Sequence, residues 1–168
     1  SRRSNGTRSE DSWKMGQVGF RLDSGNGAQS SFTVQGDAYD GYEGQFGPDA
    51  IRANGGNLIG RWSRTFTSGA DLRAQLYYDR THRRIPGSFK QDIDTFDLDL
   101  QEHTEVSGRQ NIVWGLGYRV VEDAVVNTPQ NAFLPPRVHR DWFSAFFQDE
   151  FPLSDDHLQV TLGSKVEY

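Results

Sequence analysis

The residues Thr95-Phe96-Asp97-Leu98-Asp99-Leu100-Gln101 alternate between polar and apolar side chains at every position. Successive side chains of a β-strand point to opposite faces, so a period of two predicts a strand with one polar and one apolar face. Phe96, Leu98 and Leu100 share the apolar face, and Asp97 and Asp99 share the polar face. This run decides the fold class, because the same alternation returns on both sides of it.

Alternating segments recur along the whole chain and are separated by turn residues. The expected strands cover residues 13–23, 31–39, 57–63, 72–79, 95–101, 112–120, 139–151 and 158–168. Short connections at 24–27, 67–70, 107–109 and 152–156 alternate with longer ones at 41–56, 80–92 and 122–138. No segment has a helical period. The sequence therefore predicts an all-β, antiparallel up-and-down meander of about eight strands, with a loop at 1–12 and four β-hairpins within 13–168.

The composition narrows the functional classes. Hydrophobic residues make up 35% of the chain, and the mean hydropathy is −0.72. No segment approaches the roughly 20 apolar residues of a membrane-spanning helix, but barrel strands need only about 9–11 residues each. The absence of cysteine excludes disulfides, thiolate metal sites and a cysteine nucleophile. A net charge of −5 argues against nucleic acid as a partner.

The polar faces of the expected strands carry fixed charges along their whole length. These are Arg21, Asp37, Arg61, Arg73, Asp97, Asp99, Arg119, Glu150 and Lys165. Dry burial of such charges costs on the order of several kcal/mol each, whereas a wet lumen or a plug keeps them solvated or paired. Short turns opposite long loops are also typical of outer-membrane barrels. We therefore expect a transmembrane β-barrel whose charged side faces the lumen or a plug.

Several segments resemble the barrel of TonB-dependent receptors of the ferric-siderophore type. They include Leu76-Tyr77-Tyr78-Asp79-Arg80-Thr81 and Val113-Trp114-Gly115-Leu116-Gly117-Tyr118-Arg119, and their order resembles a mid-barrel stretch of that family after Trp13. The resemblance implies a barrel of about 22 strands closed by a plug. It also implies a place in the outer membrane of a Gram-negative cell, coupling to TonB through the full-length receptor and uptake of a ferric siderophore or a similar scarce nutrient. On this reading the chain is a fragment that lacks the plug and the remaining strands.

The candidate ligand-binding residues are Arg80, His82, Arg83 and Arg84 in the expected loop at 80–92, with Tyr39 and Tyr42 at the neighbouring rim. Guanidinium groups attract an anionic ferric chelate or the phosphate of a lipopolysaccharide. The same residues also suit a solvated loop of mixed charge.

No catalytic residue or cofactor is expected. Asp97 and Asp99 are spaced to line one face of a strand, and no catalytic motif is present. His82, His103, His139 and His157 lack the spacing of metal ligands. We therefore expect a protein that is not an enzyme.

Two other architectures suit the same alternation. One is a small self-contained barrel of eight strands, filled by its own side chains. The other is a soluble antiparallel sheet or sandwich that binds a ligand and has one wet face. Arrangement of the strands in space distinguishes the three.

Overall fold

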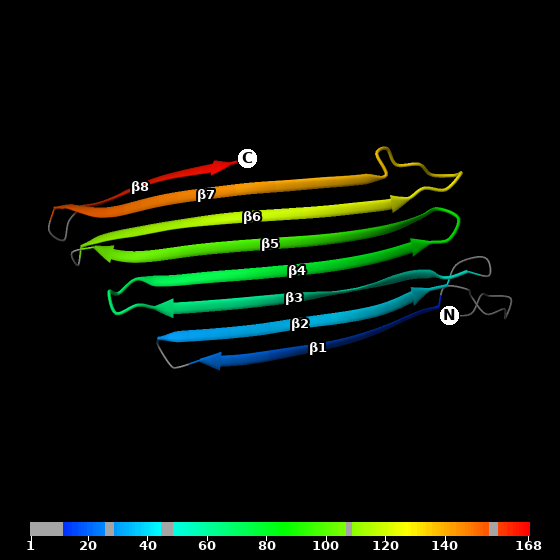
Figure 1. Ribbon diagram of the computed structural model, residues 1–168, viewed down its shortest axis with the longest axis horizontal. Helices are drawn as coiled ribbons and strands as arrows, with labels where there is room; N and C mark the ends of the chain where they lie inside the picture. Colours follow the sequence, from blue (N-terminus) through cyan, green and yellow to red (C-terminus); the bar gives the residue numbers. More distant parts are fainter. Residues whose placement is uncertain (1–11, 26–28, 45–48, 107–108, 155–157) are drawn as a thin grey trace.

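A computed structural model describes residues 12–25, 29–44, 49–106, 109–154 and 158–168. Within these residues the strands are β1 (Trp13–Gly25), β2 (Ser30–Glu43), β3 (Ile51–Thr65), β4 (Asp71–Ile85), β5 (Phe89–Val106), β6 (Gln110–Val126), β7 (Arg137–Ser154) and β8 (Leu158–Glu167). They form one sheet in chain order, and each neighbouring pair is antiparallel (Figure 1). The predicted all-β meander is confirmed.

The register confirms the predicted faces. Leu98 of β5 pairs with Leu76 of β4 and with Tyr118 of β6, and Asp97 pairs with Tyr77 and Arg119. Direct partners in an antiparallel sheet project from the same face. Carried across all the strands, the register places Phe20, Val34, Leu58, Leu76, Leu98, Leu116, Phe147 and Leu162 on one side, here called the apolar face. Arg21, Asp37, Arg61, Arg73, Asp97, Asp99, Arg119, Glu150 and Lys165 all lie on the other, the polar face.

The sheet is a single layer without a core. Ala70 is the one buried apolar residue of the described segments, while Phe20 and Phe147 of the apolar face remain 57% and 49% exposed. No second sheet packs on either face of the described segments, so the soluble sandwich is not observed. Strands β1 and β8 do not pair, so the self-contained closed barrel is not observed either (Figure 1). Both edges of the sheet are open.

All three predicted long connections are shorter than the sequence suggested, and two of them change most. The predicted loop at 80–92 is wrong: β4 continues to Ile85, β5 begins at Phe89, and only 86–88 connect them. Gly87 has a φ of 74°, and the amide of Ser88 donates to the carbonyl of Ile85 over 3.0 Å. The predicted connection at 41–56 also shortens, because β2 ends at Glu43 and β3 begins at Ile51. The strict alternation of short and long connections therefore does not hold.

The other connections differ less from expectation. The turn at 67–70 is confirmed, with Gly69 at a φ of 87° and its amide donating to the carbonyl of Phe66 over 2.9 Å. The loop predicted at 122–138 contracts to 127–136. The connection predicted from Pro152 begins later, because Pro152 belongs to β7 beside a register shift, where a missing N–H is tolerated. The expected turn residues 26–27, 107–108 and 155–156, the loop at 1–11 and His157 lie outside the described residues.

Candidate functional site

Hydrogen-bonded charges line the polar face. Arg21 contacts Asp23 over 2.7 Å within β1, and Thr33 of β2 donates to the same carboxylate over 2.7 Å. Asn57 of β3 donates to Asp37 over 2.8 Å. Contacts of this kind are worth little in open water, about 0–1 kcal/mol each. The polar face therefore offers a set of paired polar groups to a segment that covers it.

A hollow on the polar face crosses β4 to β8. Its lining includes Tyr77, Asp79, Asp97, Asp99, Arg119 and Trp142. Arg119 donates to Asp97 over 2.6 Å, and its side chain is 59% exposed where that of Asp97 is 18% exposed. The carboxylates outnumber the guanidinium in this lining, so the hollow is acidic. A cationic side chain of a segment lying against the polar face would pair with these carboxylates.

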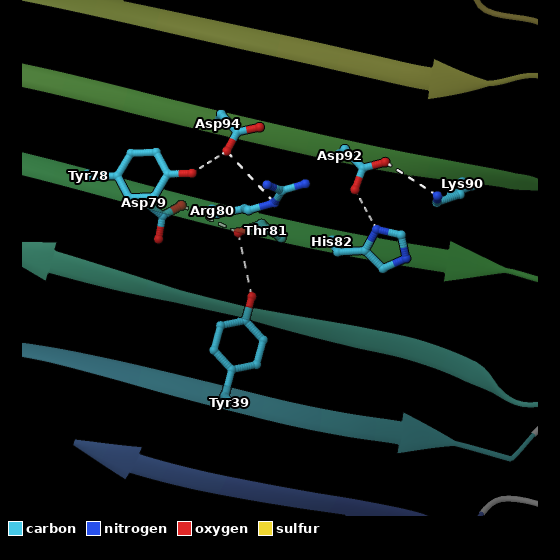
Figure 2. A network of polar contacts seen from close by, with 9 residues as sticks. All are labelled: Tyr39, Tyr78, Asp79, Arg80, Thr81, His82, Lys90, Asp92 and Asp94. Atoms are coloured by element: carbon cyan, nitrogen blue, oxygen red, sulfur yellow. Dashed lines mark hydrogen bonds and ion pairs between the residues drawn. The ribbon is translucent and has the colours of Figure 1, made fainter.

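Aromatic rings on the polar face lie over glycines of the adjacent strand. A Cβ on Gly115 of β6 would stand 2.8 Å from Cζ of Phe146 on β7. A Cβ on Gly55 of β3 would stand 2.9 Å from the hydroxyl of Tyr39. With no side chain in the way, that hydroxyl reaches Thr81 of β4 over 3.5 Å (Figure 2). The glycines therefore leave room for rings that cross a neighbouring strand.

The residues predicted as a ligand-binding loop belong to strands and are divided between the two faces. Arg80, His82 and Arg84 lie on the same side of the sheet as the apolar face, whereas Arg83 between them lies on the polar side. Tyr42 shares the side of Arg84, because both pair with Arg52. Tyr39 lies on the polar side, since it pairs with Gly55, the partner of Thr81. The structure does not bring the six candidates together as one site.

The part of the apolar side near the connections 44–50, 86–88 and 127–136 is charged instead of apolar. This charged rim consists of Arg80, His82, Arg84, Lys90, Asp92, Asp94, Glu122, His139 and Asp141. Tyr78 donates to Asp94 over 2.6 Å, and Arg80 lies 3.8 Å from the same carboxylate (Figure 2). Farther along the strands, Oδ1 of Asp92 lies 2.5 Å from Nδ1 of His82, and Oδ2 of Asp92 lies 3.7 Å from Nζ of Lys90. The hydrogen bond with His82 lowers the pKa of the Asp92 carboxyl.

Sequence reasoning missed the partners of the predicted arginines. The expected loop ends at Asp92, Asp94 falls between that loop and the next expected strand, and Lys14 and Arg52 are not among the predicted site residues. The available signal was the spacing Arg80, His82, Arg84, which continues the period of two of the preceding strand. Extending that period would have predicted a strand that carries charge on both of its faces.

No arrangement typical of a metal site occurs in the described part of the chain. A group of three or more His, Cys, Asp or Glu side chains close enough to hold an ion is not found there. Within the same segments, no helix is long and apolar enough to span a membrane.

Comparison with solved structures places the fold. The chain is similar to the alcaligin outer-membrane receptor FauA from Bordetella pertussis, at 14% identity and a TM-score of 0.64, covering 92% of this chain and 28% of that one. It is also similar to a chain of the FpvAI–pyocin S2 complex, at 11% identity and a TM-score of 0.57, covering 94% and 31%. No protein-family model and no curated protein matches. The chain thus spans about a third or less of the structures it resembles, and its fold is that of a section of a siderophore-receptor barrel.

Proposed function

We propose that the chain forms part of the transmembrane wall of a TonB-dependent receptor, which takes up ferric siderophores or similar scarce nutrients across the outer membrane. The observation that carries this proposal is the division of the sheet into two faces. Every charged residue predicted to face inward lies on the polar face, and the alternating apolar residues lie together on the other. Lipid requires such a division, because it solvates one side of the wall only.

The length of the strands supports the same proposal. Strands β3 and β4 have 15 residues each, and β5 has 18. A barrel strand crosses the hydrocarbon with about 9–11 residues, so each of these strands would extend beyond it. The charged rim occupies the surplus, since it follows the apolar residues along β4 and precedes them along β5. An apolar band with a charged margin suits a strand that leaves the bilayer.

The open edges and the polar face indicate what the rest of the receptor would supply. Strands β1 and β8 would pair with the remaining barrel strands, because bare edges favour association. The polar face, with its acidic hollow around Asp97 and Asp99, would lie against a plug. Coupling to TonB would come through the full-length receptor. The wall itself would have no catalytic step: its work is to enclose a path and to hold the plug.

Uptake by cells that carry or lack the full-length protein tests the proposal. Cells are starved of iron and given radiolabelled ferric siderophores of several chemical classes, in strains with and without TonB. We expect accumulation of at least one chelate to require both the full-length protein and TonB. The matched control is growth with excess inorganic iron, which should be the same in all strains. Equal accumulation of every chelate without the protein would contradict an uptake role.

A further inference from the structure

The connection 127–136 between β6 and β7 is bonded to the neighbouring turn 86–88, which lies at the same end of the sheet (Figure 1). The hydroxyl of Thr128 donates to the carbonyl oxygen of Ser88 over 2.5 Å. The side-chain amide of Asn131 donates to the hydroxyl of Ser88 over 2.7 Å. This loop is therefore held by a hairpin other than its own. We call residues 127–136 the strap.

A second set of contacts places the strap on the polar side of the sheet. The side-chain amide of Asn127 donates to the carbonyl oxygen of Phe133 over 3.0 Å, and its oxygen accepts from the amide of Phe133 over 2.9 Å. The ring of Phe133 lies edge-on to that of Phe89, with centroids 5.6 Å apart, an arrangement that aromatic pairs prefer. Phe89 is on the polar side, because an even number of residues separates it from Asp97 along β5. The strap therefore lies over the side that would face the interior of a barrel.

Apolar residues occupy the polar side next to the strap, where the middle of that side carries charges. Phe89 pairs directly with Ile85 of β4, and both are half-buried. Val125 of β6 lies on the same side and is half-buried as well. Its amide donates to the carbonyl oxygen of Pro136, the last residue of the strap, over 2.7 Å. Removal of apolar surface from water therefore adds to the hydrogen bonds in keeping the strap against the sheet.

We propose that the strap is a size-selective cover over the inner wall of β5 and β6 at one opening of the barrel, which admits small molecules and excludes bulky ones. The inference rests on the proposed function, since only a barrel gives the polar side an interior. It does not depend on which opening this end of the strands forms. A loop without such contacts opens readily, whereas each hydrogen bond or aromatic contact favours the closed position by about fivefold. The contacts of Asn127, Thr128, Asn131 and Phe133 together keep the strap closed.

Labelling of a single cysteine beside the strap tests this in the purified full-length protein in detergent. Val125→Cys places the thiol on the polar side next to the strap. Ala53→Cys is the reference, because Ala53 is half-buried in the same cross-strand row, on β3 away from the strap. The reagents are a small maleimide and a maleimide on a long polyethylene glycol chain. We expect the bulky reagent to react on the order of tenfold more slowly at 125 than at 53, and the small reagent to react at similar rates.

Release of the strap should remove the difference between the two positions. The double variant Asn127→Ala/Phe133→Ala loses both hydrogen bonds of the Asn127 side chain and the aromatic contact with Phe89. It should speed the bulky reagent at 125 on the order of tenfold and leave the small reagent nearly unchanged. A second double variant, Thr128→Val/Asn131→Ala, loses instead the contacts with Ser88 and should act in the same direction. Folding of each variant is checked by heat-modifiable migration on a gel.

The strap offers a matched control with the same kinds of side chain. Gln130→Ala/Leu134→Ala also removes one amide and one large apolar side chain from the loop. Gln130 is exposed and Leu134 is 87% exposed, and neither side chain makes a hydrogen bond or an ion pair with another described residue. The control variant should therefore label like the wild type with both reagents.

Several outcomes would overturn the inference. They are equal rates of the bulky reagent at 125 and 53 with the wild-type strap, no response to either release variant, and an equal response to the control variant. Release that speeds the small and the bulky reagent alike would overturn it too, since the strap would then not select by size. Recovery of the protein from the soluble fraction of the cell contradicts the proposed function instead. The labelling contrast between the two positions is measured on purified protein, so the two failures are separable.

Discussion

The ring of Phe146 on β7 lies against the backbone of its direct partner, Gly115 on β6. A Cβ on Gly115 would stand 2.8 Å from Cζ of that ring and 2.9 Å from the carbonyl oxygen of Leu100 on β5. The Phe146 ring and the Leu100 carbonyl oxygen therefore leave no room for a side chain at position 115. Glycine at this position is therefore a packing requirement of the polar face.

Substitution Gly115→Ala should destabilise the barrel. The added methyl group meets the Phe146 ring and a backbone carbonyl, and overpacking of this kind costs about 1–3 kcal/mol. Gly60→Ala is the matched control, because a Cβ on that strand glycine of β3 has nothing within 4 Å. It should be neutral or stabilising by up to about 1 kcal/mol, since alanine loses less entropy on folding. The measurement is urea unfolding of the full-length protein in micelles. An equal effect of the two substitutions would contradict the packing argument.

The faces of the sheet could be predicted from the sequence because lipid and water impose opposite demands on adjacent residues. The run from Thr95 to Gln101 shows this directly, and the register bears it out across all strands. The sequence stops predicting a strand where the two faces no longer have different surroundings. From Arg80 to Ile85 both sides of β4 lie beyond the apolar band, so the alternation of polarity disappears although the strand continues. Backbone pairing with β5, which composition does not reveal, keeps the segment extended.

For the candidate site, the sequence identified the basic residues but not their neighbours in space. Arg80, His82, Arg83 and Arg84 were read as one basic cluster, because neighbours in sequence were assumed to share a loop. On a strand, neighbours point apart, and the true neighbours come from other strands. The pairing of Arg84 with Arg52 depends on a register across a connection that the sequence does not define. The sequence alone therefore does not predict this pairing between strands.

Spin labels at three positions of β5 should distinguish lipid, water and protein surroundings. Leu98→Cys and Asp99→Cys put a label on opposite faces, and Asp92→Cys puts one on the side of Leu98 but in the charged rim. The chain contains no cysteine of its own, so each label is unique within it. We expect the label at 98 to be accessible to dissolved oxygen, the label at 92 to a water-soluble nickel chelate, and the label at 99 to show no lipid exposure. A lipid signature at 99 would reverse the assignment of the faces.

The contact between His82 and Asp92 should make the stability of the charged rim depend on pH. The pKa of the Asp92 carboxyl is lowered in the folded protein, first by its hydrogen bond with His82. A lowered pKa means that the stabilisation is present above the ordinary range of a carboxyl and is lost as pH falls through the folded value. Asp92→Asn should therefore lower the free energy of unfolding by about 1 kcal/mol at pH 7 and by much less in acid.

Asp40→Asn is the matched control for this pH effect. Asp40 lies in the same cross-strand row as His82 and Asp92, yet it makes no side-chain contact with another described residue. Its substitution should change the unfolding free energy little at either pH. Thermal unfolding of the full-length protein at pH 7 and in acid measures both. A destabilisation by Asp92→Asn that is as large in acid as at neutral pH would exclude the carboxylate as its source.

The isolated chain of 168 residues should associate through its edges. Strand β1 is exposed along its whole length and has β2 as its only partner strand among the described residues, while β8 pairs with β7 alone. Unpaired N–H and C=O groups recruit further strands, so the refolded chain in detergent should sediment as oligomers or aggregates. The full-length protein, in which other strands would cover both edges, is the control and should sediment as one defined species. A stable monomer of the isolated chain with both edges bare would show that this arc needs no neighbouring strands, and would count against its place in a larger wall.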